Sequence, residues 1–279
     1  MVINALTIDV EDYFQVSAFA PYIARATWNE VPRRIEPNMD RILALLDEHR
    51  THATFFTLGW IARRHPGLIR AIVDGGHELA SHGYAHRRVT EQTWAAFRED
   101  VGRAKKLLED IGGVRVLGYR APSFSIGEGN RWAHDVLHAA GYRYSSSVYP
   151  IRHDHYGWPA APRFAFRPHG EKGLIELPAS TVPLFGRNLP AAGGGYFRLL
   201  PYVISRWLVR RLNAREHAPC IFYFHPWELD AGQPRLPHIS LKTRFRHYTN
   251  LARMPAKIGA LLHDFRWDRM DRVFAEVTA

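Results

Sequence analysis

Short, almost continuous apolar runs alternate along the chain with longer segments in which apolar residues recur every three or four positions. Such runs are typical of strands buried on both faces, and the spaced pattern is typical of helices with one face on a core. The alternation predicts an α/β fold with a parallel sheet that is closed, or nearly closed, into a barrel. We expect strands at 5–10, 53–58, 77–81, 114–120, 142–148, 174–177 and 220–224, and helices at 37–49, 66–74, 90–111, 130–140 and 199–212.

Glycines and loops organise these elements into one unit. Paired glycines at 75–76 and 112–113 would end the second and third helices, and Thr90 is the expected N-cap of the third. The segment 151–167 is predicted to be a long ordered loop, and 190–196 a flexible loop. Neither is typical of a domain linker, and a chain of 279 residues can bury its core in a single domain.

Candidate metal ligands follow two of the predicted strands. The sequence Asp-Val-Glu-Asp occupies 9–12, and His82 and His86 lie four residues apart after the strand 77–81. Two imidazoles at this spacing can reach one ion, and a carboxylate from the acidic group would give three protein ligands and an open position for water. The carboxyl ends of barrel strands share one face, where barrel enzymes carry their active sites.

Charge and cysteine content restrict the partners and the compartment. The formal net charge is +10, which attracts anionic partners, but the arginines are scattered and no nucleic-acid-binding motif is present. Cys220 is the one cysteine, so no intrachain disulfide can form. The N-terminal residues 1–9 lack a signal-peptide pattern, and no apolar run has membrane-spanning length. We expect a cytoplasmic protein, peripheral to the inner membrane at most, for which the basic stretch 206–212 is a candidate surface helix.

Four motifs in a fixed order resemble the polysaccharide deacetylases of carbohydrate esterase family 4, the NodB-type deacetylases. This resemblance covers about the first 230 residues and implies a distorted (β/α)7-type barrel with a NodB-like fold. Its catalytic motifs would span 7–228, and 229–279 would be an extension packed on the same single domain 1–279. The motifs are Thr-Ile-Asp-Val-Glu-Asp at 7–12, Ser-His-Gly-Tyr-Ala-His at 81–86, Gly-Tyr-Arg-Ala-Pro-Ser at 118–123 and Phe-Tyr-Phe-His-Pro-Trp-Glu at 222–228.

Three further segments resemble one subgroup of that family, the deacetylases associated with exosortase-type exopolysaccharide gene clusters. They are the opening 9–16, the run 53–60 and the C-terminal motif 246–250. The resemblance implies a role in exopolysaccharide synthesis. It also implies an N-acetylated glycan as the partner, with peripheral contact to membrane-linked glycan machinery and no binding of nucleic acid.

The resemblance assigns catalytic roles to Asp9, Arg120 and His225. Asp9 matches the general base, since a carboxylate beside an activated water can take its proton. Arg120 matches the arginine that pairs with this base, stabilises its ionised form and fixes its orientation. His225 follows the strand 220–224 and matches the general acid that protonates the leaving amine.

The resemblance also assigns His82 and His86 as metal ligands and leaves the acidic ligand open. In the common family pattern the acidic ligand directly follows the base, where this chain has Val10. Strand alternation places Glu11 on the same face as Asp9, whereas a turn beginning at Val10 would present Asp12. Both remain candidates. One divalent ion is expected, zinc in first place, with cobalt, manganese and nickel as alternatives that a His₂-carboxylate site also accepts.

The remaining site candidates lie around the substrate. Pro122 and Ser123 match the turn whose backbone N–H stabilises the tetrahedral oxyanion. A departure from the family is Ser145, which stands where many relatives carry an aspartate, so this chain would have to orient its arginine or its acid histidine by other contacts. Candidate walls of the acetyl or sugar pocket are Phe124, Tyr149, Leu177 and Trp227.

The sequence therefore predicts a metal-dependent hydrolase that removes N-acetyl groups from an amino sugar of an exopolysaccharide or its precursor and releases acetate. A second hypothesis is a cyclic amide or ureide amidohydrolase on the same fold, for which a narrow pocket would be expected in place of an open groove. A third is a catalytically silent glycan-binding protein. The presence of Asp9, both histidines of 82–86, Arg120 and His225 argues against the third.

Overall fold

A single parallel sheet organises the chain. The computed structural model describes residues 2–154, 156–170 and 173–278. Seven strands follow the order β10-β1-β2-β3-β4-β5-β6, β9 pairs with β1 as well, and every pairing in this sheet is parallel. The strands are β1 (Ile3–Val10), β2 (Thr54–Thr57), β3 (Glu78–Ser81), β4 (Gly118–Tyr119), β5 (Tyr144–Ser145), β6 (Ile175–Glu176), β9 (Ile221–Phe224) and β10 (Arg266–Asp268).

β1 lies at the centre of the structure. Ala5 to Ile8 pair with β9, and Thr7 to Val10 pair with β2. Because the two registers overlap at Thr7 and Ile8, β2 and β9 occupy opposite edges of β1. Every residue of β1 after Ile3 is buried, as expected for a strand covered on both faces. The end of this strand therefore brings Asp9 to the middle of the sheet.

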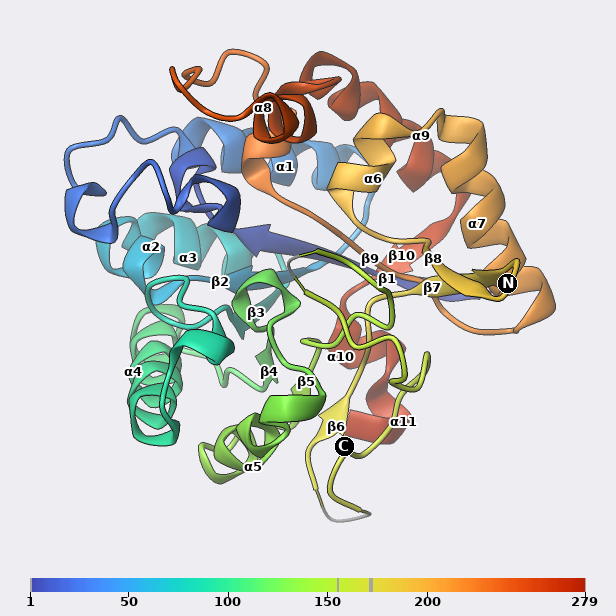
Figure 1. Cartoon of the computed structure of the whole chain (residues 1–279), viewed down its shortest axis with the longest axis horizontal. Helices are drawn as coiled ribbons and strands as arrows, with labels where there is room; N and C mark the ends of the chain where they lie inside the picture. Colours follow the sequence, from blue (N-terminus) through green and yellow to red (C-terminus); the bar gives the residue numbers. More distant parts are fainter. Residues whose placement is uncertain (1, 155, 171–172, 279) are drawn as a thin grey trace.

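Helices cover the outside of the curved sheet, which forms a half-barrel (Figure 1). Figure 1 shows α2 to α5 along β2 to β5, and α6, α7 and α9 around β9 and β10. Among the described residues, no helix is long and apolar enough to cross a membrane. The helices are α1 (Ile35–Glu48), α2 (Gly59–Arg64), α3 (Pro66–Asp74), α4 (Trp94–Gly112), α5 (Trp132–Ala139), α6 (Gly194–Leu199), α7 (Tyr202–Arg215), α8 (Leu241–Tyr248), α9 (Met254–Asp264), α10 (Met270–Val273) and α11 (Ala275–Thr278).

The predicted α/β fold is confirmed, with differences in single elements. The helix 66–74 is found with its predicted bounds. The predicted helix 90–111 is shorter, because η4 (Val89–Glu91) is a separate 3-10 turn and the hydroxyl of Thr93, not Thr90, accepts the capping hydrogen bond from Ala96. The predicted strands 114–120 and 142–148 each pair over two residues only.

The prediction of a flexible loop at 190–196 is wrong. Pro190 ends the hairpin of β7 (Thr181–Leu184) and β8 (Arg187–Pro190), and Gly194 begins α6. Gly193 has φ +103° and packs against the ring of Tyr223, while a Cβ on Gly194 would collide with the carboxylate of Glu228. These glycines allow close approach of two buried segments and do not indicate mobility.

Candidate active site

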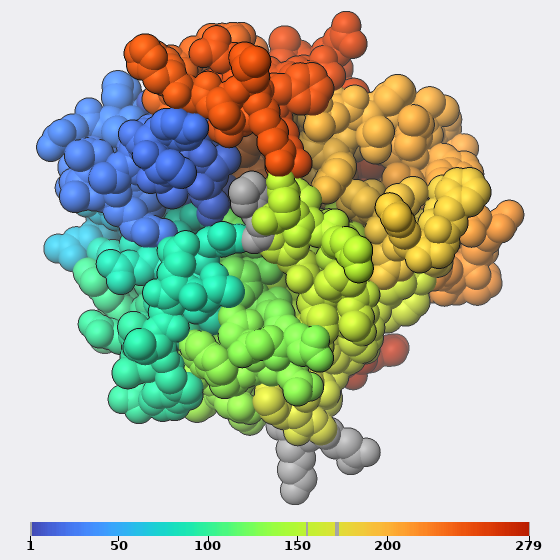
Figure 2. All heavy atoms as spheres, viewed as in Figure 1, coloured from blue at the N-terminus to red at the C-terminus, as the bar shows by residue number. Residues whose placement is uncertain are grey.

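A cleft of about 700 Å³ opens at the carboxyl ends of the strands. Its floor is formed by residues that follow β1, β3 and β9, and its walls come from segments far apart in the sequence. Figure 2 shows the face on which three of these segments meet, the N-terminal residues in blue, the segment after β5 in lime and α8 in orange. The predicted active-site face of the barrel is thus the hollowed one.

Glu11, His82 and His86 form a buried group that can hold a metal ion. One ligand atom from each lies within 4.8 Å of the others. His82 Nδ1 is 2.8 Å from the carbonyl oxygen of Arg120, an arrangement that leaves Nε2 for an ion. Glu11 Oε2 is buried and 2.8 Å from His86 Nε2, but it has no hydrogen-bond partner in the described structure. A carboxylate oxygen without a hydrogen bond, facing two imidazoles, fits a divalent cation.

Protonation at this group suits a metal site. Burial lowers the pKa of His82 to about 4, so its imidazole is neutral and able to coordinate. Burial opposes ionisation of Glu11, but the neighbouring histidines, His86 first, outweigh it and lower the pKa of Glu11 to about 2. The acidic ligand is therefore an anion near neutral pH.

Asp12, the alternative acidic ligand, faces away from this group. One of its oxygens accepts a hydrogen bond from Tyr13 N, and the other accepts hydrogen bonds from Arg34 N and Ile35 N. It caps the 3-10 turn η1 (Tyr13–Gln15) and joins it to the start of α1. Of the two candidates left open by the sequence, Glu11 is the one that joins His82 and His86 in a group able to hold a metal ion.

Asp9 and Arg120 form a buried ion pair beside the metal-binding group. Arg120 NH1 donates to Asp9 Oδ1 and to Thr7 Oγ1, each at 2.7 Å. Its NH2 donates to Ser146 Oγ at 2.9 Å and its Nε to the Ser146 carbonyl oxygen at 3.1 Å. Ser145 bonds instead to Ser147. Contacts from Thr7 and Ser146, and none from Ser145, therefore orient the arginine in the described structure.

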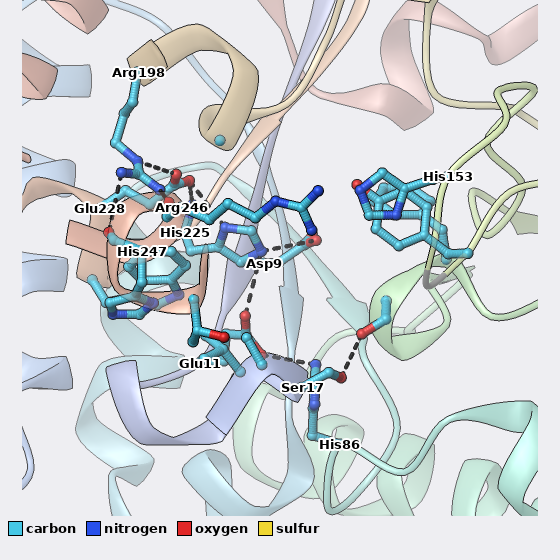
Figure 3. A pocket seen from close by; sticks show the side chains of 18 of the residues that line it. Asp9, Glu11, Ser17, His86, His153, Arg198, His225, Glu228, Arg246 and His247 are labelled. Atoms are coloured by element: carbon cyan, nitrogen blue, oxygen red, sulfur yellow. Dashed lines mark hydrogen bonds and ion pairs between the residues drawn. The ribbon is translucent and has the colours of Figure 1, made fainter. Parts of the chain in front are cut away.

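His225 lies between two sets of carboxylates (Figure 3). Its Nε2 is 3.3 Å from Glu11 Oε1 and 3.9 Å from Asp9 Oδ2, while Nδ1 is 3.0 Å from Glu228 Oε2. Burial favours the neutral ring, but the hydrogen bond to Glu228 and the nearby charges outweigh it and raise the pKa of His225 to about 9. The ring is thus held as a proton donor that faces the cleft with Nε2.

Glu228 and Arg198 belong to the site but received no role from the sequence. Arg198 Nε donates to Glu228 Oε1 at 2.7 Å, and both side chains are buried. Arg198 also donates to the carbonyl oxygens of Arg246, His247 and Thr249 at the end of α8. The sequence feature that could have indicated Glu228 is its position three residues after His225 in the motif 222–228.

The predicted oxyanion turn has an unusual backbone. Within η5 (Pro122–Phe124), Ser123 and Phe124 have φ of +55° and +46°. Phe124 N–H donates to the Ala121 carbonyl oxygen and Pro122 has no N–H, which leaves Ser123 N–H as the candidate donor. Ser123 Oγ is 2.5 Å from Ser17 Oγ across the cleft floor. A left-handed backbone is energetically costly for residues other than glycine and is often found at active sites.

The aromatic wall differs in part from the prediction. Phe124 and Trp227 line the cleft, as expected. Tyr149 does not, because it is buried behind Tyr156 and its hydroxyl donates to the Ala192 carbonyl oxygen. Leu177 is likewise buried, in a hydrophobic cluster with residues of the strands, and does not line the cleft. Phenylalanine and tyrosine residues that line the cleft without having been predicted are Tyr22, Tyr156, Tyr196, Tyr223 and Phe245.

Two families match consecutive parts of the chain. Residues 23–145 match the polysaccharide deacetylases, and residues 146–275 match a domain of unknown function (DUF3473). A chitooligosaccharide deacetylase of Sinorhizobium fredii is 34% identical over 148 residues, which are 50% of this chain and 59% of the relative. A peptidoglycan deacetylase of Helicobacter pylori is 27% identical over 113 residues, 40% of this chain and 38% of the relative. The chain thus spans about two fifths to three fifths of these relatives.

Solved structures share the fold over nearly the whole chain. A protein of Mycobacterium smegmatis assigned to the polysaccharide deacetylases has a TM-score of 0.64 at 23% identity, covering 99% of this chain and 90% of its own. A T48 deacetylase with substrate has a TM-score of 0.51 at 16% identity, covering 99% of this chain and 92% of its own. At these identities the likeness shows the fold alone. Residues 23–145 thus match the polysaccharide deacetylases, the fold is shared with solved structures of that kind, and residues from all four sequence motifs line one cleft.

Proposed function

We propose that the protein is a metal-dependent N-deacetylase that releases acetate from an N-acetylated amino sugar of a glycan. The supporting observation is the convergence of Asp9 and Glu11 with His82, His86 and His225 on the floor of one cleft. These residues supply a metal-binding group, a carboxylate base and an imidazolium acid within reach of one another. A metal-assisted amide hydrolysis uses all three.

The residues divide the work of the reaction. A divalent ion held by Glu11 and the two histidines would polarise the acetyl carbonyl and acidify a water molecule. Asp9, held in place by Arg120, takes the proton of the attacking water. Ser123 N–H donates to the oxygen that becomes negative as the carbonyl is attacked. His225 then protonates the sugar nitrogen from Nε2 as the carbon–nitrogen bond breaks.

The shape of the cleft favours a glycan over a small cyclic amide. Its volume of about 700 Å³ exceeds what a single ring amide requires, and aromatic side chains of both family segments line it. Aromatic faces suit sugar rings. Together with the motifs at 9–16 and 246–250, this supports an exopolysaccharide or its precursor as the substrate. The donor set of one carboxylate and two imidazoles supports zinc as the first candidate metal.

Acetate release from a short N-acetylglucosamine oligomer tests the proposal. We expect turnover by metal-loaded protein, with a fall of about 10²–10⁴-fold in Asp9→Asn because the base is lost. His82→Ala should lose both activity and bound metal, whereas His263→Ala should lose neither, because that imidazole is 84% exposed on α9.

Two outcomes would count against the proposal in different ways. Metal-loaded protein that hydrolyses ring amides but not the oligomer would favour the amidohydrolase hypothesis. Protein that binds the oligomer and releases no acetate would favour the glycan-binding hypothesis. That possibility has a precedent, since a Bacillus anthracis protein described as a CE4 family pseudoenzyme has a TM-score of 0.50 to this chain at 14% identity, covering 99% of this chain and 65% of its own.

A further inference from the structure

One wall of the cleft carries an excess of positive charge. The segment 231–263, which includes α8, contains Lys and Arg residues but neither Asp nor Glu. Lys242 and Arg246 of this segment line the cleft. The acidic residues that line it are Asp9, Glu11 and Glu228, all buried on the floor and engaged with histidine or arginine. The mouth of the cleft is therefore basic and its floor acidic.

Lys242 and Arg246 converge on a single point. They are one helical turn apart, so both project from the same face of α8. Lys242 Nζ is 2.6 Å from Asp154 Oδ2, and Arg246 NH1 is 3.2 Å from Oδ2 and 3.3 Å from Oδ1 of the same carboxylate. Asp154 comes from the segment after β5, which meets α8 across the cleft mouth (Figure 2). Two cations thus surround one carboxylate, which also has the imidazole Nδ1 of His153 3.1 Å from its Oδ1.

This cluster is open to exchange with solvent and ligands. The side chains of Lys242, Arg246 and Asp154 are 63%, 43% and 37% exposed. Exposed ion pairs contribute little to stability, so displacing the Asp154 carboxylate by another anion costs little free energy. The arginine can bind a carboxylate or phosphate with two parallel hydrogen bonds, and the lysine adds a point charge.

Apolar surface lies beside the two cations. Leu241 and Phe245 of α8 are 82% and 59% exposed, and Phe245 lines the cleft. A ligand at this position would therefore meet a charged group and an aromatic face together. That combination suits a sugar ring carrying an acidic substituent, or a sugar joined to the phosphate of a carrier.

We propose that Lys242 and Arg246 form a subsite for an anionic group, a carboxylate or a phosphate, that the glycan carries near the N-acetyl sugar. Asp154 occupies the subsite between substrates and is displaced when the glycan binds. The inference rests on the proposed function, since it extends the substrate cleft of that reaction. It assigns a binding role to the part of the chain that matches a domain of unknown function.

Binding measurements on the Asp9→Asn background test the subsite without turnover. The probes are a neutral N-acetylglucosamine tetramer, the same tetramer oxidised to a terminal carboxylate, and the tetramer 1-phosphate, titrated by calorimetry. We expect at least one anionic tetramer to bind about tenfold more tightly than the neutral one at low salt, with the advantage shrinking as salt is added. Preference for the carboxylate would indicate an acidic sugar as the source, and preference for the phosphate a carrier.

Variants on the same helix make the assignment specific. Lys242→Gln with Arg246→Gln should abolish the tenfold advantage and leave affinity for the neutral tetramer within about twofold. Arg244→Gln is the matched control, because Arg244 is an exposed cation of α8 that does not line the cleft. Asp154→Asn should tighten binding of the anionic tetramer, since it removes the competing carboxylate.

Equal affinity for all three tetramers, or an equal effect of Arg244→Gln, would overturn the subsite. This failure is distinguishable from failure of the deacetylase proposal. Acetate release by a protein that binds all three tetramers equally would support the deacetylase proposal and contradict the subsite proposal. The opposite result is binding that is selective for anionic tetramers and depends on Lys242 and Arg246, in a protein that never releases acetate. It would support the subsite proposal and contradict the deacetylase proposal.

Discussion

The ring nitrogen of His225 that faces away from the cleft, Nδ1, contacts a buried carboxylate. Glu228 is fully buried, bonds to His225 Nδ1 and is neutralised by the equally buried Arg198. Buried ion pairs seldom raise stability over an apolar alternative, because removing two charges from water offsets their attraction. We interpret this pair as a positioning device that sets the orientation of the imidazole for proton transfer.

Glu228→Gln tests this positioning role. The amide keeps the size of the side chain but removes the charge that holds the imidazolium, so we expect kcat for acetate release to fall by about 10–100-fold. KM should change little, because Glu228 acts through His225 and the sugar is held by the walls. Steady-state kinetics give both constants.

Glu216→Gln serves as the control for this variant. Glu216 pairs with Arg163, and neither residue lines the cleft. The acetate-releasing activity of Glu216→Gln should match that of the unaltered protein. A rise in KM with unchanged kcat in Glu228→Gln would instead assign the glutamate to substrate binding.

The sequence predicts the site residues whose position follows from standing at the end of a strand. It does not predict those whose position depends on contacts with distant parts of the chain. Asp9, His82 and Arg120 lie together because each stands at or directly after the carboxyl end of a strand of the same sheet. The choice between Glu11 and Asp12 could not be made, because it depends on backbone N–H groups at 34–35, far along the chain. Tyr149 shows the same limit, since only the fold places it behind the cleft wall.

At the scale of elements, periodicity identified seven of the ten strands but only five of the eleven α-helices in the described residues, and it overestimated the length of the strands β4 and β5. β4 and β5 each pair over two residues, after which the chain leaves the ladder to form the arginine and serine contacts at 120 and 145–147. Apolar residues continue beyond these strands because they pack in the core, so their pattern does not reveal where pairing ends. The hairpin of β7 and β8 and the short β10 lacked any periodic signal long enough to detect.

The starts of β2 and β3 are joined by a histidine that must be neutral. His77, which precedes β3, accepts a hydrogen bond at Nδ1 from the backbone N–H of Ala53, which precedes β2. Burial lowers the pKa of His77 to about 4. In the unfolded chain the ordinary value near 6.5 applies. The unfolded state therefore binds more protons between these two values, and stability falls as pH drops from 6.5 to 4.

His77→Gln should flatten this part of the stability profile. For a pKa shift of this size, protonation of His77 changes the free energy of unfolding by up to about 3 kcal/mol between pH 6.5 and 4. Glutamine offers an acceptor that does not titrate, so the variant should lose less free energy of unfolding between pH 6.5 and 4 than the unaltered protein. Denaturant titrations at each pH measure it. The exposed His263→Gln should leave the slope unchanged, and equal slopes in all three proteins would contradict the assignment.

At the scale of the whole molecule, the boundary between the two matched families does not coincide with a boundary in the structure. β9 and β10, from the second segment, both pair with β1, from the part of the chain that precedes it. Met270 N donates to Thr54 Oγ1, and Arg269 donates to the Gly76 carbonyl oxygen. The cleft likewise combines Glu11, which precedes both segments, with His82 and His86 of the first segment and His225 of the second. We propose that the two form one domain.

One domain should unfold in one step, and this can be tested with a probe in each segment. Trp60 lies in the first segment and Trp267 in the second, both largely buried. With fluorotryptophan at each position, the two NMR signals should report the same thermal midpoint. Met270→Ala removes a fully buried side chain of the second segment at a cost of about 2–5 kcal/mol and should lower both midpoints equally. A drop at Trp267 alone would show that the segments fold separately, and the cleft would then lie between two domains.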